Sequence, residues 1–120
     1  MKKSIEVEKE MELFDDLTIN EVWKKAKPYK RFELYKRDRL GSLMFFDDLG
    51  IESENGWVIS MIKSKEDGGT LDIKNLEPLH WKNYVNKIYI DLIITKFLSQ
   101  KSNFNFQSIR YYFNLISLHN

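Results

Sequence analysis

The stretch that most constrains the fold is residues 77–100, EPLHWKNYVNKIYIDLIITKFLSQ. Its apolar side chains recur every three or four residues, a spacing that places them on one face of a helix. Pro78 suits the first helical position, where the missing N–H is not needed. The sequence therefore predicts a helix over residues 78–99, with Trp81, Val85, Ile88 and Leu92 buried in the core of a small domain.

Charged residues argue against a membrane span in this stretch. Lys87, Asp91 and Lys96 interrupt the apolar run, whereas a spanning helix needs about 18 nearly uncharged residues. The N-terminal sequence MKKSIEVEKEMELF lacks the apolar segment of a signal peptide, and the chain has no cysteine, which favours a reducing compartment. We therefore expect a cytoplasmic protein with no membrane partner.

Two shorter helices are expected before the central part of the chain. Residues 4–16 favour a helix because glutamate and lysine are better helix formers than strand formers, although Ile5 and Val7 also alternate as in a strand. Thr18 followed by Glu21 is a capping-box pattern. It predicts a helix over residues 19–27, with Val22, Trp23 and Ala26 on its contact side and Pro28 ending it.

The central part of the chain has the patterns of β-strands separated by turns. Alternating or continuous apolar residues predict strands at 31–37, 43–46, 57–63 and 70–75. Asn55-Gly56 and Gly68-Gly69 mark turns, so we expect a four-stranded antiparallel meander. With a final short helix over residues 106–118, the prediction is one α+β domain, 1–120, whose long helix packs on the sheet.

Charge is distributed along the chain in stripes of alternating sign. Residues 1–22 carry three lysines and seven acids, residues 23–39 carry eight cations and two acids, and residues 40–57 carry four acids and no cation. Such stripes either pair with one another inside the molecule or present charged patches to partners.

Recognisable catalytic patterns are missing from the sequence. His80 and His119 are the only histidines, and neither belongs to a set with the spacing of metal ligands; His80 is expected on the surface or in the packing of the long helix. There is no glycine-rich phosphate loop and no serine in a nucleophile elbow. We therefore expect a protein without enzymatic activity, metal or cofactor.

One enzymatic alternative rests on Asp48, Asp72 and Lys74. Metal-dependent nucleases place two carboxylates on Mg²⁺ and a lysine beside the attacking water. Asp72-Ile73-Lys74 on a predicted strand, preceded by Asp48, would match that arrangement. Short triplets of this kind also arise by chance in a highly charged chain.

A second alternative is nucleic-acid binding by the basic stretch KKAKPYKRFELYKRDR, in which tyrosine and phenylalanine alternate with cations. Cations of that kind meet phosphates while rings stack on bases. The near-neutral net charge of +1 gives no global attraction to nucleic acid. The candidate residues are Lys24, Lys25, Lys27, Lys30, Arg31, Lys36, Arg37 and Arg39.

The favoured interpretation is a protein-binding module. A rigid scaffold with a charged patch suffices for a small bacterial inhibitor, such as an immunity protein or antitoxin that blocks a nuclease-type toxin, and a phage-encoded inhibitor of bacterial defence fits equally well. A basic nuclease cleft would favour acidic residues on the inhibitor. The candidate partner-binding residues are Asp47, Asp48, Glu52 and Glu54, followed by Asp15 and Asp16; these acids could instead pair with the cations of residues 23–39.

Overall fold

The computed structural model describes residues 2–3 and 10–99, which fall into two compact units, Met1–Trp81 and Lys82–Asn120. The division does not test whether the two units unfold together, so the single domain remains a prediction. The expected helix over residues 106–118 lies outside the described residues, as do residues 4–9 of the one expected over 4–16. The rest of that expected helix is wrong beyond Met11: Glu10 and Met11 are helical, residues 12–14 form a turn and a bend, and Asp15 and Asp16 are the cap and the first residue of helix α2 (Asp16–Trp23).

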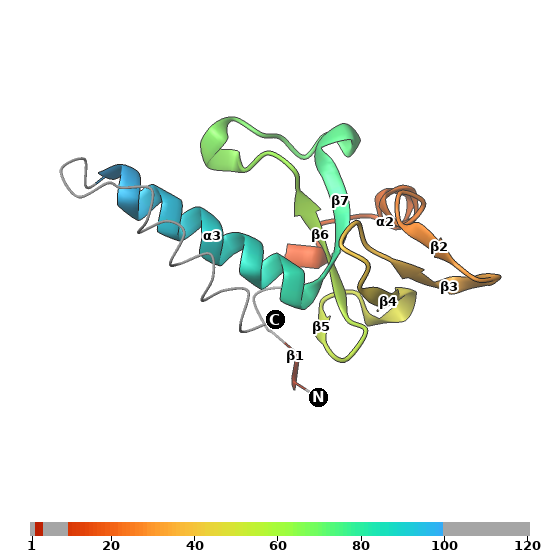
Figure 1. Ribbon diagram of the computed structural model, residues 1–120. Helices are drawn as coiled ribbons and strands as arrows, with labels where there is room; N and C mark the ends of the chain where they lie inside the picture. Colours follow the sequence, from red (N-terminus) through yellow and green to blue (C-terminus); the bar gives the residue numbers. More distant parts are fainter. Residues whose placement is uncertain (1, 4–9, 100–120) are drawn as a thin grey trace. The chain divides into compact units, whose positions relative to one another are not determined.

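The first unit contains short strands and the α-helix α2 (Asp16–Trp23), and Figure 1 shows β2 and β3 as a projecting hairpin. Three 3₁₀ turns connect its strands: η1 (Phe46–Asp48), η2 (Lys65–Asp67) and η3 (Ile73–Asn75). The strands are β1 (Lys2–Lys3), β2 (Lys27–Tyr29), β3 (Phe32–Arg37), β4 (Leu43–Phe45), β5 (Ile51–Glu52), β6 (Trp57–Met61) and β7 (Leu76–His80).

The fold is α+β with antiparallel strand pairing, as predicted, but the four-stranded meander is wrong. The strands form a three-stranded sheet in the order β2-β3-β4 and two separate pairs, β6-β7 and β1-β5. Strands were correctly predicted at β3, β4 and β6, whereas β1, β2, β5 and β7 were not predicted.

The predicted strand over residues 70–75 is wrong because side chains there satisfy the backbone. The amide of Asn75 accepts from the Lys63 N–H at 2.8 Å and donates to the carbonyls of Lys63 at 3.0 Å and Thr70 at 2.7 Å. Such bonds compete with a strand ladder. The strand that pairs with β6 therefore starts at Leu76, and Pro78 lies opposite Ile59 instead of opening a helix.

Helix α2 begins three residues earlier than predicted, and Asp15 is its cap in place of Thr18. The Asp15 carboxylate accepts from the Thr18 N–H at 2.8 Å. The helix ends at Trp23, residues 24–26 form a turn and a bend, and β2 begins at Lys27; Pro28 is tolerated there because β2 is at the edge of the sheet.

The core of the first unit lies between α2, β4, β6 and β7. The Trp23 and Trp57 rings pack with their centroids 4.9 Å apart. Each indole N–H finds a carbonyl, Trp23 that of Glu33 at 2.9 Å and Trp57 that of Phe46 at 3.0 Å, as buried tryptophans require. The predicted contact residues Val22, Trp23 and Ala26 are buried, although Ala26 lies in the turn after α2; they are joined by Met11, Met44, Val58, Ile59, Leu76 and Leu79.

Helix α3 (Trp81–Ser99) is long, as predicted, but its predicted burial is wrong. None of its described side chains is buried: Trp81 is half-buried, while Val85, Ile88 and Leu92 are 40%, 39% and 62% exposed. Apolar residues such as Tyr89 and Leu98 lie outside the expected stripe, so the sequence pattern did not define a single face. Within residues 2–3 and 10–99, no helix combines the length and the apolar character needed to cross a membrane.

Candidate functional site

The acidic segment, defined as Asp47, Asp48, Glu52 and Glu54, lies between β4 and β6, as the sequence predicted. Two of its acids lie on η1, Glu52 on β5 and Glu54 in the turn that follows. The backbone around these acids is fixed by hydrogen bonds: Phe45 N–H to Asn55 O at 2.8 Å, and Gly50 N–H to Trp57 O at 2.8 Å. The segment is therefore tied to both flanking strands and is not a free loop.

The carboxylates of the acidic segment form no ion pair among the described residues. Asp47 and Glu54 are exposed, while Asp48 and Glu52 are half-buried. Asp48 Oδ2 accepts from the Ser53 hydroxyl at 2.6 Å. The ion pairs Lys24–Glu21 and Arg39–Glu77 lie elsewhere, so the acids of the segment do not pair with the cations of residues 23–39.

The structure brings three further residues to the acidic segment that the sequence analysis missed. Strand β1 pairs with β5 so that Lys2 lies opposite Glu52. His80 Nε2 lies 2.7 Å from the Glu54 carbonyl, and the Trp81 indole donates to Ser53 O at 2.6 Å. His80 is buried in the packing, one of the two expected places, but it is the last residue of β7 and does not belong to the long helix. Long-range pairing of this kind leaves no local sequence signal.

Gly56 allows the turn after Glu54 to close tightly. A Cβ atom at this position would lie 1.6 Å from the Ile51 carbonyl oxygen. Any side chain larger than hydrogen would therefore push β5 away from the start of β6, which is why Asn55-Gly56 suits this turn.

Asp15 and Asp16, the second group of candidate binding acids, lie at the N-terminus of α2 and not in the acidic segment. Both are exposed. Hydrogen bonds from Thr18, through its side chain and its backbone N–H, hold the pKa of Asp15 below its ordinary value. The Asp15 carboxylate thus already serves as a helix cap, and only Asp16 keeps an uncommitted carboxylate.

The nuclease alternative loses its structural premise. Asp72 is the N-cap of η3 and accepts from the Lys74 N–H at 3.0 Å, so the Asp72-Ile73-Lys74 triplet is a capped turn and not part of a strand. In the part of the chain that the structure describes, no three histidine or acidic side chains are grouped as metal ligands would be.

Six of the eight candidate basic residues bond acceptors within the first unit. Lys24 pairs with Glu21 at 2.9 Å, and Arg39 Nε lies 3.2 Å from Glu77 Oε1. Four others donate to backbone carbonyls: Lys25 Nζ to Leu76 O at 2.7 Å and also to Ile73 O, Lys36 Nζ to Trp23 O at 3.5 Å, Arg37 Nη1 to Gly41 O at 2.8 Å, and Lys27 Nζ to Arg39 O at 3.4 Å.

The β2–β3 hairpin carries five of the candidate cations: Lys27, Lys30, Arg31, Lys36 and Arg37. Lys30 and Arg37 lie against the Tyr29 ring, and Lys36 lies against the Trp23 ring. The aromatic row, defined as Tyr29, Phe32, Tyr35 and Phe45, crosses all three strands of the sheet.

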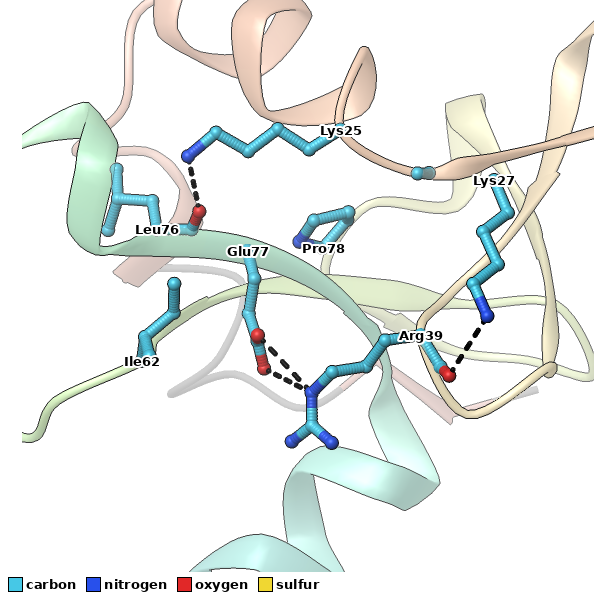
Figure 2. Close-up of a pocket in the computed structure, with 8 residues that line it drawn as sticks. Lys25, Lys27, Arg39, Ile62, Leu76, Glu77 and Pro78 are labelled. Atoms are coloured by element: carbon cyan, nitrogen blue, oxygen red, sulfur yellow. Dashed lines mark hydrogen bonds and ion pairs between the residues drawn. The ribbon is translucent and has the colours of Figure 1, made fainter.

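A pocket of about 230 Å³ lies between the start of β2, the turn after β3, and β7 (Figure 2). Its charged groups bond to the protein itself: Arg39 Nε to both Glu77 oxygens at 3.2 and 3.3 Å, and Lys27 Nζ to Arg39 O at 3.4 Å. The Lys25 ammonium points away from Arg39, toward Leu76 (Figure 2). Ligand sites usually exceed 300 Å³ and have convergent polar groups, so this pocket is not the favoured site.

Comparison of the chain with protein-family models, with curated proteins and with solved structures finds no match.

Proposed function

We propose that this chain is a non-enzymatic protein-binding module, an inhibitor of the immunity-protein or antitoxin kind that neutralises a nuclease-type toxin through its acidic segment. The observation that carries the proposal is that four carboxylates, which pair with no cation of residues 10–99, are held on a backbone fixed between β4 and β6. Its cysteine-free composition supports a cytoplasmic site of action.

Carboxylates suit such a target because a nuclease binds phosphates in a basic cleft. Acids on the inhibitor offer the cleft the same kind of charge, which speeds association and selects the partner. A preformed segment also loses little conformational entropy on binding. The Glu54 and Ser53 carbonyls accept hydrogen bonds from the His80 and Trp81 rings, and these bonds provide the preorganisation.

The test reverses the charges of Asp47 and Glu54, the two exposed acids of the segment, to lysine. Once a partner has been captured from the source organism, its affinity is measured over a range of salt concentrations. We expect association slowed about tenfold or more at low salt, with a weaker salt dependence than the parent protein shows. The matched control, Glu12→Lys with Glu66→Lys, makes the same change of net charge at exposed acids outside the segment.

Equal affinity and salt dependence in the Asp47/Glu54 variant and the control would overturn the proposed surface. A separate assay decides between the inhibitor and the nuclease alternative. The purified protein should not cleave plasmid or RNA in the presence of Mg²⁺, and cleavage that disappears in an Asp72→Ala variant would replace the inhibitor proposal.

A further inference from the structure

We propose that the β2–β3–β4 sheet binds single-stranded nucleic acid on the aromatic row, with bases stacking on its rings and phosphates meeting the hairpin cations. This surface is separate from the acidic segment, and the inference does not rest on the proposed inhibitor function. It narrows the basic stretch expected from the sequence to the hairpin cations Lys27, Lys30, Arg31 and Arg37, of which Lys30 and Arg37 lie against the Tyr29 ring.

The rings form a continuous surface from the hairpin tip to β4. Tyr29 and Phe32 stack at a centroid distance of 6.1 Å, Phe32 meets Tyr35 edge-on at 6.1 Å, and Tyr35 stacks on Phe45 at 4.8 Å. Phe32 is 56% exposed, and the other three rings are half-buried. Each ring therefore keeps an accessible part while its neighbours fix its orientation, which is the arrangement needed for base stacking.

Cations are built into the same surface. The guanidinium carbon of Arg37 lies 4.8 Å from the Tyr29 ring centroid, and Lys30 Nζ lies 5.3 Å from it. Lys27 lies opposite Arg37 in the sheet, and Arg31 is exposed at the hairpin turn. Against them the hairpin carries one acid, Glu33, so the local charge favours a polyanion.

The combination of aromatic rings and cations favours a single strand of nucleic acid over an acidic peptide or a duplex. An acidic peptide would satisfy the cations and leave the aromatic row bare, and a duplex would hide the faces of its bases within its own stack. A single strand offers both phosphates and free base faces. The row spans three adjacent strands, which suits a short stretch of single strand.

The test measures binding of fluorescent oligothymidylate to the full chain at low salt. Phe32→Ala should weaken binding about tenfold or more, because it removes a stacking platform. The matched control is Leu34→Ala, an apolar residue of the same strand that is 48% exposed and has no ring. Binding by this control should equal that of the parent, and unfolding in urea should show that both variants are folded.

A second variant tests the phosphate contacts. Lys30 has a left-handed backbone, φ 52°, which asparagine tolerates. Lys30→Asn should therefore reduce the salt dependence of binding by about 0.7 in the log–log slope, as expected when one contact to a single strand is lost. Lys24→Ala, which removes a cation already paired with Glu21, should leave the slope unchanged.

Several outcomes would overturn the proposal. The first is that oligothymidylate does not bind at low salt, and the second is that Leu34→Ala and Phe32→Ala lose affinity equally. The third is that a duplex binds more tightly than a single strand. The fourth is that polyglutamate displaces the probe as efficiently as unlabelled oligothymidylate does. The last two would show that the surface responds to charge alone.

Discussion

Asp38 connects the core of the first unit to the acidic segment through a series of hydrogen bonds. Its side chain is fully buried. Oδ1 accepts from the N–H groups of Leu40 at 3.0 Å and Ser42 at 2.9 Å, and Oδ2 accepts from the His80 N–H at 3.0 Å. His80 in turn contacts the carbonyl of Glu54. Asp38 therefore fixes both the β3–β4 turn and the end of β7 that supports the acidic segment.

Replacing Asp38 with alanine should destabilise the protein strongly. The N–H groups of Leu40, Ser42 and His80 would lose their acceptor; that of His80 is buried and the other two are part-buried, and leaving a buried group unsatisfied costs about 1–3 kcal/mol. We expect the free energy of unfolding, measured in urea at neutral pH, to fall by about 3 kcal/mol or more. Asp47→Ala, at an exposed acid, should change it by less than about 0.5 kcal/mol. Similar unfolding midpoints for the two variants would contradict this role for Asp38.

At the scale of the element, the capping of α2 by Asp15 should make stability depend on pH. The pKa of Asp15 is lowered in the folded state by the hydrogen bonds from Thr18. A lowered folded-state pKa gives stability that is present above the unfolded-state pKa and is lost as the pH falls through the folded-state pKa. Asp15→Ala should therefore be less stable than the parent at neutral pH, and the difference should shrink in acid.

Urea unfolding of the parent, Asp15→Ala and Asp15→Asn at several pH values measures this effect. Asparagine caps helices as well as aspartate does but does not titrate. Asp15→Asn should therefore keep most of the stability at neutral pH and should not share the additional loss in acid. A constant difference between parent and Asp15→Ala at all pH values would show that the carboxylate is not the cap.

The elements that the sequence predicted correctly are those whose pattern is local. Alternation at β3 and β6 and the apolar run at β4 depend on neighbours within a few residues. The errors come from competition between local signals. Asn75 and Asp72 use their side chains to close a turn where alternation predicted a strand, and Pro78, a good first helical residue, is in β7 because Ile59 pairs with it.

The position of the acidic segment along the chain was predictable from the sequence, but the distant residues that contact it were not. A run of acids between two apolar strands showed where the acidic segment would lie. Lys2, His80 and Trp81 reach the segment from parts of the chain far away in sequence, and no spacing rule connects them. The aromatic row was visible as alternating rings and cations, but only the pairing of β3 with β4 adds Phe45 to it.

At the scale of the whole molecule, the basic stripe of residues 23–39 and the acidic stripe of residues 40–57 are connected through β4. The aromatic row ends at Phe45 in β4, and the next residue, Phe46, begins η1 and the acidic segment. Strand β4, which lies between the hairpin and the acidic segment, is held by Asn55, whose side-chain amide donates to Leu43 O at 3.2 Å. A polyanion on the hairpin and a basic protein on the acidic segment would therefore engage neighbouring parts of the first unit.

The junction between β7 and α3 bears on the domain count. His80 ends the strand and Trp81 begins the helix, so no linker separates them. Trp81 belongs to the first unit, where its backbone N–H donates to Gly56 O at 3.1 Å. Domain boundaries usually fall in exposed, flexible linkers, and an isolated helix of about this length is marginal in water. We therefore expect α3 to unfold together with the first unit.

A matched pair of substitutions tests this expectation. Leu79→Ala removes a fully buried side chain from β7 and should lower the free energy of unfolding by about 2–5 kcal/mol. Leu92→Ala, on the exposed part of α3, should change it by less than about 0.5 kcal/mol.

Near-ultraviolet circular dichroism follows tryptophan packing, including Trp23 and Trp57, while far-ultraviolet circular dichroism follows helix content. In one cooperative domain the two signals give the same urea midpoint, and Leu79→Ala shifts both equally. Helical signal that persists after tryptophan packing is lost would establish two independently unfolding domains.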